Sequence, residues 1–277
     1  MSVPAVVTLE VSGVSKTFGR GDTAHTAVQT LDLVVDSHSA IGIVGESGSG
    51  KSTLSRMLVA LEHPSAGTIT LDGVDIVEMD KKAESGRELR RVVQYVAQDT
   101  FSSFDPRRSL RDALATPLRV LRGITGAEAD ERIAEIARLL RLKPEMIDKY
   151  PHQVSGGQRQ RFALARALVV RPRILLCDEV VSALDVSVQG AVLNTIKTYC
   201  DEHSVGLVFV SHGLPATAFI ADELIVMQNG HVVEHRPTQD VLAHPEHPYT
   251  ATLLDAYRRA PRHIVSLVEP LPEVELA

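Results

Sequence analysis

Cysteines and long hydrophobic runs are scarce in this sequence, and their scarcity excludes several classes of protein. Cys177 and Cys200 are the two cysteines among 277 residues, and their separation is unlike that of metal ligands. We therefore expect neither a disulfide framework nor a zinc or iron–sulfur site, which fits a reducing compartment. No run approaches the roughly 18 apolar residues of a membrane-spanning helix, and the N-terminus lacks the basic and apolar segments of a secretory signal. We expect any role at a membrane to depend on a partner protein.

Positive charge is in deficit as well, because 29 lysines and arginines stand against 35 aspartates and glutamates, for a net charge of −6. Proteins that wrap nucleic acid present a basic surface, so we expect no nucleic-acid partner. Hydrophobic residues make up 44% of the chain and charged residues 23%, which is ordinary for a globular protein. A chain of this length can bury a large core.

Short apolar runs of strand length alternate along the chain with segments of helical periodicity. We expect strands at residues 8–14, 31–35, 40–44, 67–73, 174–177 and 205–210, and helices at 54–61, 110–121, 127–142 and 188–199. Strands that alternate with helices predict an α/β fold with a mostly parallel, doubly wound sheet. The last forty or so residues are rich in proline, so we expect them to form an appended, partly irregular tail.

A glycine-rich segment directly follows the strand expected at residues 40–44 and precedes the first expected helix. It reads Gly45-Glu46-Ser47-Gly48-Ser49-Gly50-Lys51-Ser52-Thr53, which matches the phosphate-loop (P-loop) pattern G-x-x-x-x-G-K-[ST]. Glycines let backbone N–H groups surround a phosphate, and the helix N-terminus adds partial positive charge. Lys51 would place its charge between the β- and γ-phosphates, and Ser52 would offer a hydroxyl to Mg²⁺. The segment therefore predicts phosphate binding.

An apolar run from Arg173 ends in two carboxylates, Asp178 and Glu179. Acidic residues are common at strand ends, but downstream of a P-loop this pattern is typical of a Walker B strand. In such a strand Asp178 would hold Mg²⁺ through water, and Glu179 would polarise the water that attacks the γ-phosphate.

The segment Ser155-Gly156-Gly157-Gln158 opens a helix that continues through Leu168. A helix start presents free N–H groups and partial positive charge, although Ser155 alone would also serve as an ordinary N-cap. Between a P-loop and a Walker B strand, the segment resembles the signature motif of the ATP-binding cassette (ABC) family. In that family the motif binds the γ-phosphate held by the P-loop of a second subunit.

The resemblance covers residues 5 to 258 and implies roles for four more residues. Phe18 matches the aromatic residue that stacks on adenine, although it would also suit an ordinary core. Gln98 matches the Q-loop glutamine, which contacts Mg²⁺ and the attacking water. Asp185, in Ser-Ala-Leu-Asp, matches the D-loop that links the two sites of a dimer, and His212 matches the switch histidine that contacts the γ-phosphate. A lone histidine after a strand is more often structural, but its place downstream of Glu179 favours the switch role.

The resemblance also implies a domain organisation. We expect residues 1–235 to form an ABC cassette that has a P-loop NTPase core, an antiparallel β subdomain and an inserted helical subdomain at about 99–165. Residues 236–277 would form a C-terminal extension. Three positions depart from the family pattern: Val154 replaces a usual leucine, Val180 a usual proline, and Gly213 a usual aspartate.

Two stretches resemble one branch of the family, the oligopeptide/dipeptide and nickel importers. Residues 98–107 are similar to the long Q-loop of that branch, and residues 234–254 are similar to its C-terminal extension. The tail has no cysteine, so it resembles the subunits without an iron–sulfur cluster. The chain is then expected to hydrolyse ATP and power import of a peptide, nickel or similar solute. The alternative is a soluble accessory ATPase of an enzyme complex, such as one for phosphonate cleavage.

The resemblance implies cofactors and partners too. The cofactors would be ATP and Mg²⁺, the metal being held by Ser52, Gln98 and Asp178. The partners would be a second cassette, identical or different and placed head-to-tail, two transmembrane permease subunits and, indirectly, an extracytoplasmic solute-binding protein. The chain would then be peripheral, at the cytoplasmic face of the cell membrane.

Overall fold

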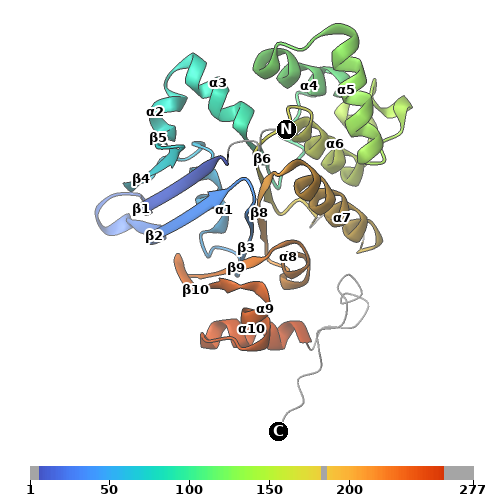
Figure 1. Ribbon diagram of the computed structural model, residues 1–277. Helices are drawn as coiled ribbons and strands as arrows, with labels where there is room; N and C mark the ends of the chain where they lie inside the picture. Colours follow the sequence, from blue (N-terminus) through green and yellow to red (C-terminus); the bar gives the residue numbers. More distant parts are fainter. Residues whose placement is uncertain (1–5, 182–185, 259–277) are drawn as a thin grey trace.

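The strands of the protein form two separate sheets, as the computed structural model shows for residues 6–181 and 186–258 (Figure 1). The smaller sheet has four strands in the order β2-β1-β4-β5, and its pairings are all antiparallel. Its strands are β1 (Thr8–Phe18), β2 (His25–Asp36), β4 (Ala66–Leu71) and β5 (Val74–Asp75). Strands β1 and β2 are longer than predicted, and β4 lies inside the sheet rather than at its edge, because the two-residue β5 pairs beyond it.

The larger sheet has six strands in the order β10-β9-β3-β8-β7-β6. All its pairings are parallel except that of β10 with β9. The strands are β3 (Ala40–Val44), β6 (Val93–Val96), β7 (Ile174–Asp178), β8 (Gly206–Ser211), β9 (Glu223–Gln228) and β10 (His231–Pro237). The mostly parallel sheet predicted from the alternation of strands and helices is confirmed.

The central strands are buried on both faces, because successive side chains point to opposite sides of a sheet. In β7, Ile174 and Leu176 join a core shared with the small sheet and α1 (Lys51–Met57). Their neighbours Leu175 and Cys177 join a second core with α7 (Val186–His203). The small sheet and α1 therefore cover one face of the larger sheet, and other helices cover the other face.

The second core is completed by a group of helices between β6 and β7. They are α4 (Leu110–Pro117), the π-helix η2 (Leu118–Arg122), α5 (Gly126–Leu139), the 3-10 turns η3 (Pro144–Met146) and η4 (Pro151–Gln153), and α6 (Gly156–Leu168). In α4, Ser109 caps the helix by accepting the N–H of Asp112 at 3.1 Å. Figure 1 shows this group at the upper right, on the side of the large sheet opposite β1 and β2.

Two segments are more regular than the sequence predicts. Before β6 lie α2 (Ile76–Asp80) and α3 (Ala83–Val92), and α3 buries only Gly86 and Leu89, so its apolar periodicity is weak. At the C-terminal end, the expected irregular tail contains α9 (Thr238–Ala243) and α10 (Pro248–Arg258). Prolines 237 and 248 stand at the starts of these helices, where proline is favoured because no N–H is needed there.

A third core holds α9 and α10 against the large sheet. It combines Val241, Leu242, Tyr249 and Leu254 with Val44 and Leu224. The boundary expected at residue 235 falls within β10, and the 3-10 helix η1 (Gly21–Thr23) and α8 (Leu214–Ile220) complete the described elements. Among the helices of residues 6–181 and 186–258, none combines the length and apolarity needed to cross a bilayer.

Two leucines that follow α1 provide a matched test of the core. Leu58 is fully buried, whereas 61% of Leu61 is exposed. Leu58→Ala should lower the free energy of unfolding by about 2–5 kcal/mol, because it leaves a cavity in a packed core. Leu61→Ala should change it by less than about 0.5 kcal/mol. Urea denaturation of both variants measures the difference, and equal effects would contradict this packing.

Candidate functional site

The predicted site residues meet at one edge of the large sheet. Strands β3, β8, β7 and β6 are neighbours, and parallel strands end at the same edge, where ligands of α/β folds bind. The P-loop follows β3, His212 follows β8, Asp178 ends β7 with Glu179 next, and Gln98 follows β6. A cavity of about 330 Å³ lies among them, lined by Ala27, Ser47, Gly48, Gly50, Lys51, Ser52, Thr53, Gln98, Glu179 and His212.

Lys51, the first residue of α1, folds back over the P-loop. Its Nζ donates to the carbonyl oxygens of Gly45 at 2.8 Å and Glu46 at 2.7 Å. Only 5% of the residue is exposed. Burial lowers the pKa of Lys51, although the carboxylates of Glu179, Asp178 and Glu46 act in the opposite direction. The ammonium group is thus held by backbone dipoles at the position from which it would reach a phosphate.

Asp178 is almost completely buried and is held by two hydroxyl groups. Its Oδ1 lies 3.2 Å from Ser52 Oγ, and its Oδ2 accepts a hydrogen bond from the Tyr95 hydroxyl at 2.8 Å. Burial raises the pKa of Asp178 despite these hydrogen bonds, and the neighbouring charge of Glu179 adds to the rise. Burial beside Asp178 also raises the pKa of Tyr95, so this hydroxyl remains a donor.

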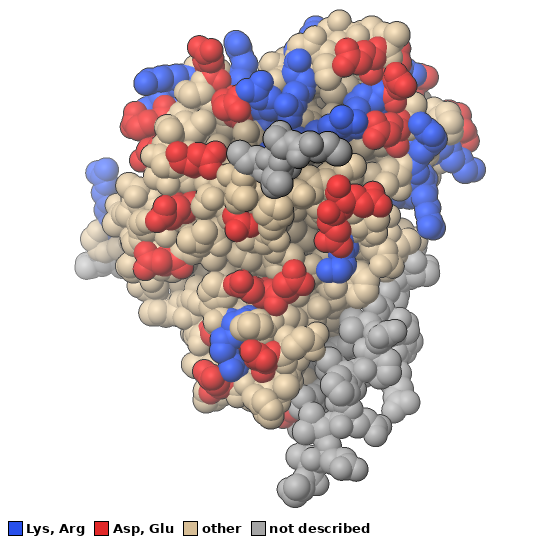
Figure 2. Space-filling view, viewed as in Figure 1, with Lys and Arg blue, Asp and Glu red and all other residues tan. Residues whose placement is uncertain are grey.

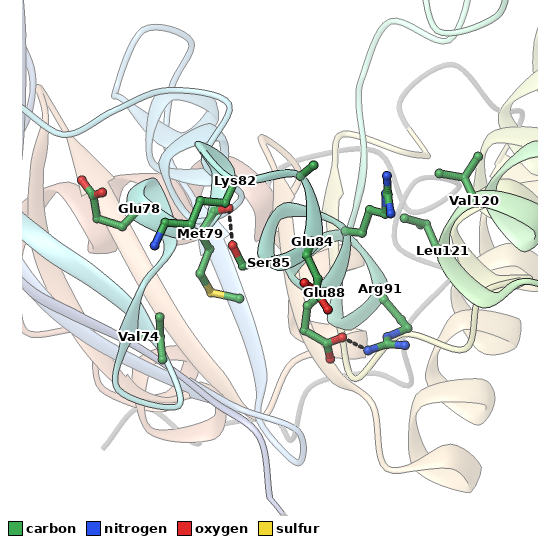
Figure 3. Close-up of a pocket in the computed structure, with 12 residues that line it drawn as sticks. Val74, Glu78, Met79, Lys82, Glu84, Ser85, Glu88, Arg91, Val120 and Leu121 are labelled. Atoms are coloured by element: carbon green, nitrogen blue, oxygen red, sulfur yellow. Dashed lines mark hydrogen bonds and ion pairs between the residues drawn. The ribbon is translucent and has the colours of Figure 1, made fainter.

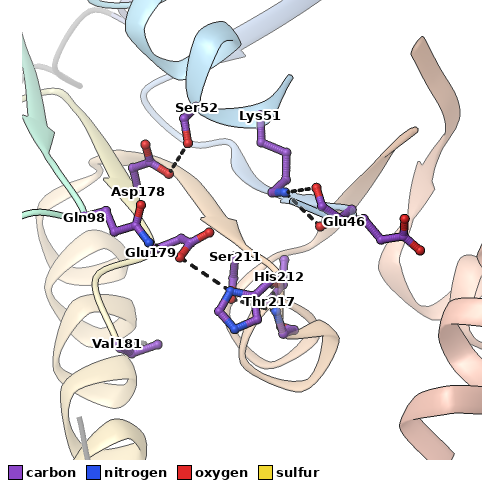
Figure 4. Close-up of polar contacts among 12 residues, drawn as sticks. Glu46, Lys51, Ser52, Gln98, Asp178, Glu179, Val181, Ser211, His212 and Thr217 are labelled. Atoms are coloured by element: carbon purple, nitrogen blue, oxygen red, sulfur yellow. Dashed lines mark hydrogen bonds and ion pairs between the residues drawn. The ribbon is translucent and has the colours of Figure 1, made fainter. Parts of the chain in front are cut away.

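The carboxylate of Glu179 lies between the side chains from the two adjacent strand ends (Figure 4). Its Oε2 accepts a hydrogen bond from Gln98 Nε2 at 2.6 Å and lies 3.5 Å from His212 Nδ1. The backbone of Glu179 is left-handed, with a φ of 52°, and its N–H donates to Val210 O at 2.9 Å. Such a conformation is uncommon outside glycine and clusters at functional sites, and here it turns the carboxylate towards the cavity.

The cavity fits a nucleoside triphosphate with a divalent cation. A Cβ at Gly48 would meet no atom within 4 Å, so the loop is open beside the cavity. In the part of the chain that the structure describes, no three His, Cys, Asp or Glu residues gather as a metal site. The Ser52 hydroxyl and the Asp178 carboxylate would suffice as the few oxygen ligands that Mg²⁺ usually takes from a protein when phosphates supply others.

Two other predicted groups, at the end of β1 and at the start of α6, do not line this cavity. Phe18 is 42% exposed at the end of β1, and Lys16 Nζ lies 4.8 Å from its ring centre. Ser155 and Gln158 form a capping box at the start of α6, in which each side chain accepts the other's N–H, at 3.2 and 2.9 Å. Asp185 lies outside the described residues.

Two residues of the site were not predicted from the sequence. Tyr95 lies on β6, three residues before Gln98, and a tyrosine there is an ordinary strand residue until its contact with Asp178 is seen. Ala27 lines the cavity from β2, and an alanine carries no chemical signal. The alternation of side chains along β6 was the available signal, because it places Tyr95 on the same face of the sheet as other core residues.

Two of the departures from the family pattern, Val180 and Gly213, fit their local surroundings. Val180 is 1% exposed and belongs to the second core, which the helices complete. Gly213 stands at the N-cap of α8 without a side-chain cap, and its N–H donates to Ser211 Oγ at 2.9 Å. A Cβ at Gly213 would come no closer than 3.5 Å to another group, so space does not require glycine here.

Comparisons with known proteins agree with this geometry. The family model described as ABC transporter matches residues 28–182. Di/tripeptide transport ATP-binding protein DppF of Pseudomonas aeruginosa (strain UCBPP-PA14) is 38% identical over 243 residues, which cover 88% of this chain and 75% of that protein. Oligopeptide transport ATP-binding protein OppF of Lactococcus lactis subsp. lactis (strain IL1403) is 38% identical over 230 residues, 83% of this chain and 72% of that protein.

Two solved structures share the fold. The dimeric structure of the bacterial ABC transporter cassette MJ0796 matches with a TM-score of 0.77 and 26% identity, over 83% of this chain and 98% of that one. A post-hydrolysis dimer of MJ0796 bound to ADP and Pi matches with the same TM-score and coverage and 27% identity. The chain therefore belongs to the ABC transporter family, and within it is an ATPase that binds and hydrolyses ATP.

Proposed function

We propose that this chain powers a membrane importer of small peptides by hydrolysing Mg-ATP at the P-loop. One observation carries the catalytic part of the proposal: Glu179 Oε2 is held between Gln98 and His212 at the mouth of the P-loop cavity. The solute class rests on two similar proteins, a di/tripeptide transport ATP-binding protein and an oligopeptide transport ATP-binding protein.

In this proposal the residues of the cavity divide the work on the terminal phosphate. Lys51 exchanges its two carbonyl partners for phosphate oxygens, and the backbone N–H groups of the P-loop bind the remaining charge. Ser52, Asp178 and Gln98 would hold Mg²⁺, which would neutralise charge on the phosphates. Glu179 orients and deprotonates the attacking water, while His212, 61% exposed in its side chain, is placed to contact the γ-phosphate.

The adenine base of the nucleotide also needs a binding surface, and the site needs a second chain. Phe18 offers an exposed ring for adenine stacking at the end of β1.

The start of α6, with Ser155, Gly156, Gly157 and Gln158, does not line the cavity of its own chain. We propose that it serves the site of a head-to-tail partner cassette, identical or different. Asp185 would link the two sites.

Nucleotide then controls dimer closure through charge. Without nucleotide, closure would bring the positive N-terminus of α6 towards the positive P-loop with no anion between them. With ATP bound, the γ-phosphate neutralises both, and hydrolysis removes that bridge.

A groove beside the helical group offers a docking surface for permease loops. A cavity of about 820 Å³ lies between α2–α3 and η2, and Val120 and Leu121 face it across from Arg91 (Figure 3). A neighbouring cavity of about 480 Å³ shares Val120 and Leu121 and is also lined by Leu61. Exposed apolar side chains of this kind mark interaction sites, and Val120 is 49% exposed.

Charge is distributed in keeping with this surface. Figure 2 shows basic side chains concentrated in the upper part of the view, among acidic ones, with few below. Arg87, Arg90, Arg91 and Arg108 line the two cavities. We propose that two permease subunits bind here at the cytoplasmic face of the membrane, and that a solute-binding protein acts on them from the other side.

Asp178→Asn tests the proposed metal ligand. Folding raises the pKa of the Asp178 carboxyl. Ionisation of this group therefore lowers the free energy of unfolding as the pH rises from the ordinary pKa through the folded pKa. The nucleotide-free variant should therefore melt at a higher temperature than the wild type at pH 8, and the difference should shrink in acid. Hydrolysis should fall by about 10- to 100-fold, as for groups that support a metal through water. A lower melting temperature at pH 8, or unchanged Mg²⁺ dependence, would contradict the assignment.

Glu179→Gln tests the proposed base. The variant should keep ATP binding, hydrolyse about 10²- to 10⁴-fold more slowly, and accumulate as a closed dimer with its functional partner cassette. Light scattering after size-exclusion chromatography measures the dimer. Lys51→Ala is the control and should neither bind ATP tightly nor dimerise. Hydrolysis at the wild-type rate in Glu179→Gln would remove Glu179 from this role.

Co-purification from native membranes tests the transport role. The tagged chain should bring down permease subunits, and Val120→Asp should release them while ATP binding is kept. Val34→Asp is a matched control, because Val34 is also exposed, at 55%, but lies on β2 of the small sheet. Recovery of enzymes without permeases would instead favour an accessory ATPase.

A further inference from the structure

Tyr249 connects the C-terminal helices to the P-loop. It lies in the first turn of α10, is 9% exposed, and packs in the third core beside Val44, the residue before the P-loop. Its hydroxyl oxygen accepts the backbone N–H of Glu46 at 2.9 Å. The two residues are 203 positions apart in the sequence, so the contact depends on the fold of the whole chain.

The peptide between Gly45 and Glu46 is held at both of its polar ends. Lys51 Nζ donates to the Gly45 carbonyl at 2.8 Å, and Tyr249 accepts from the Glu46 N–H of the same peptide. Lys51 also binds the next carbonyl, that of Glu46, at 2.7 Å. Lys51 and Tyr249 therefore fix the loop together.

This double hold cannot persist when a nucleotide binds, because Lys51 is needed at the phosphates. We propose that Tyr249 is a positioning residue that keeps the start of the P-loop in place after Lys51 has left its carbonyl partners. The inference rests on the proposed role of Lys51. It implies that the Tyr249 hydroxyl contributes more to the nucleotide-bound state than to the free state.

The position of Tyr249 is itself fixed by a buried carboxylate. Glu234 on β10 is 6% exposed, and it accepts the N–H groups of Glu246 at 3.1 Å and His247 at 3.2 Å. Arg236 pairs with Glu234 and donates to His244 O at 2.6 Å. The turn that leads into α10 is thus tied to β10 at several points, which orients the Tyr249 hydroxyl.

A second tie reaches the other side of the loop. Gly230, in the turn between β9 and β10, donates its N–H to Ser49 O at 3.1 Å. The hairpin and α10 therefore hold the P-loop at Ser49 and at Glu46.

Tyr249→Phe removes the hydroxyl and keeps the ring. Its Kd for a non-hydrolysable Mg-ATP analogue should rise about 3- to 10-fold, in line with one neutral hydrogen bond. KM for ATP should rise with it, while kcat at saturating ATP stays within about twofold. Tyr199→Phe is the matched control, because Tyr199 is also buried and its hydroxyl donates to Leu168 O at 3.4 Å, away from the cavity.

The controls separate failure of this inference from failure of the proposed function. A wild-type Kd in Tyr249→Phe, with binding lost in Lys51→Ala, would overturn the role of Tyr249 alone. An equal rise in Kd for Tyr199→Phe would also overturn it, because the effect would then reflect general loss of a buried hydroxyl. Absence of nucleotide binding by the wild type would overturn both proposals.

Discussion

The P-loop lies against two neighbouring backbones at distances that exclude any side chain. A Cβ at Gly45 would lie 2.1 Å from Met227 O on β9, and one at Gly50 would lie 2.2 Å from Ala27 O on β2. The loop is therefore seated on both sheets at once. This seating places Lys51 and Ser52 at the start of α1 opposite the carboxylates that end β7, and the rest of the site depends on it.

The same arrangement buries two groups at the site whose charged forms are disfavoured by burial. Burial lowers the pKa of Lys51 and raises the pKa of Asp178, so folding opposes the charge on each. A bound anion would add negative charge beside Lys51, and its cation would add positive charge beside Asp178. These buried charges thus lower the stability of the free protein but favour ligand binding, as is common at functional sites.

The sequence predicts the residues with a chemical role at the site better than it predicts the residues that hold them in position. P-loop residues and strand-end carboxylates are recognisable because their type and spacing are dictated by phosphate and metal. Tyr95 and Tyr249 act through contacts with residues far away in the sequence, which no local pattern reveals. The helix α3 was missed because Leu89 is its main apolar anchor, and α10 because its prolines indicate irregular chain until one is seen to start a helix.

The ties from Glu234 to the turn before α10 cross the boundary that the sequence suggests near residue 235. The C-terminal segment is therefore not an interchangeable module. A chimera joined at this boundary would combine a strand from one parent with a turn and helix from another, and would inherit a foreign support for its phosphate loop. Grafts between related cassettes should instead be joined before β9, so that the hairpin and both helices travel together.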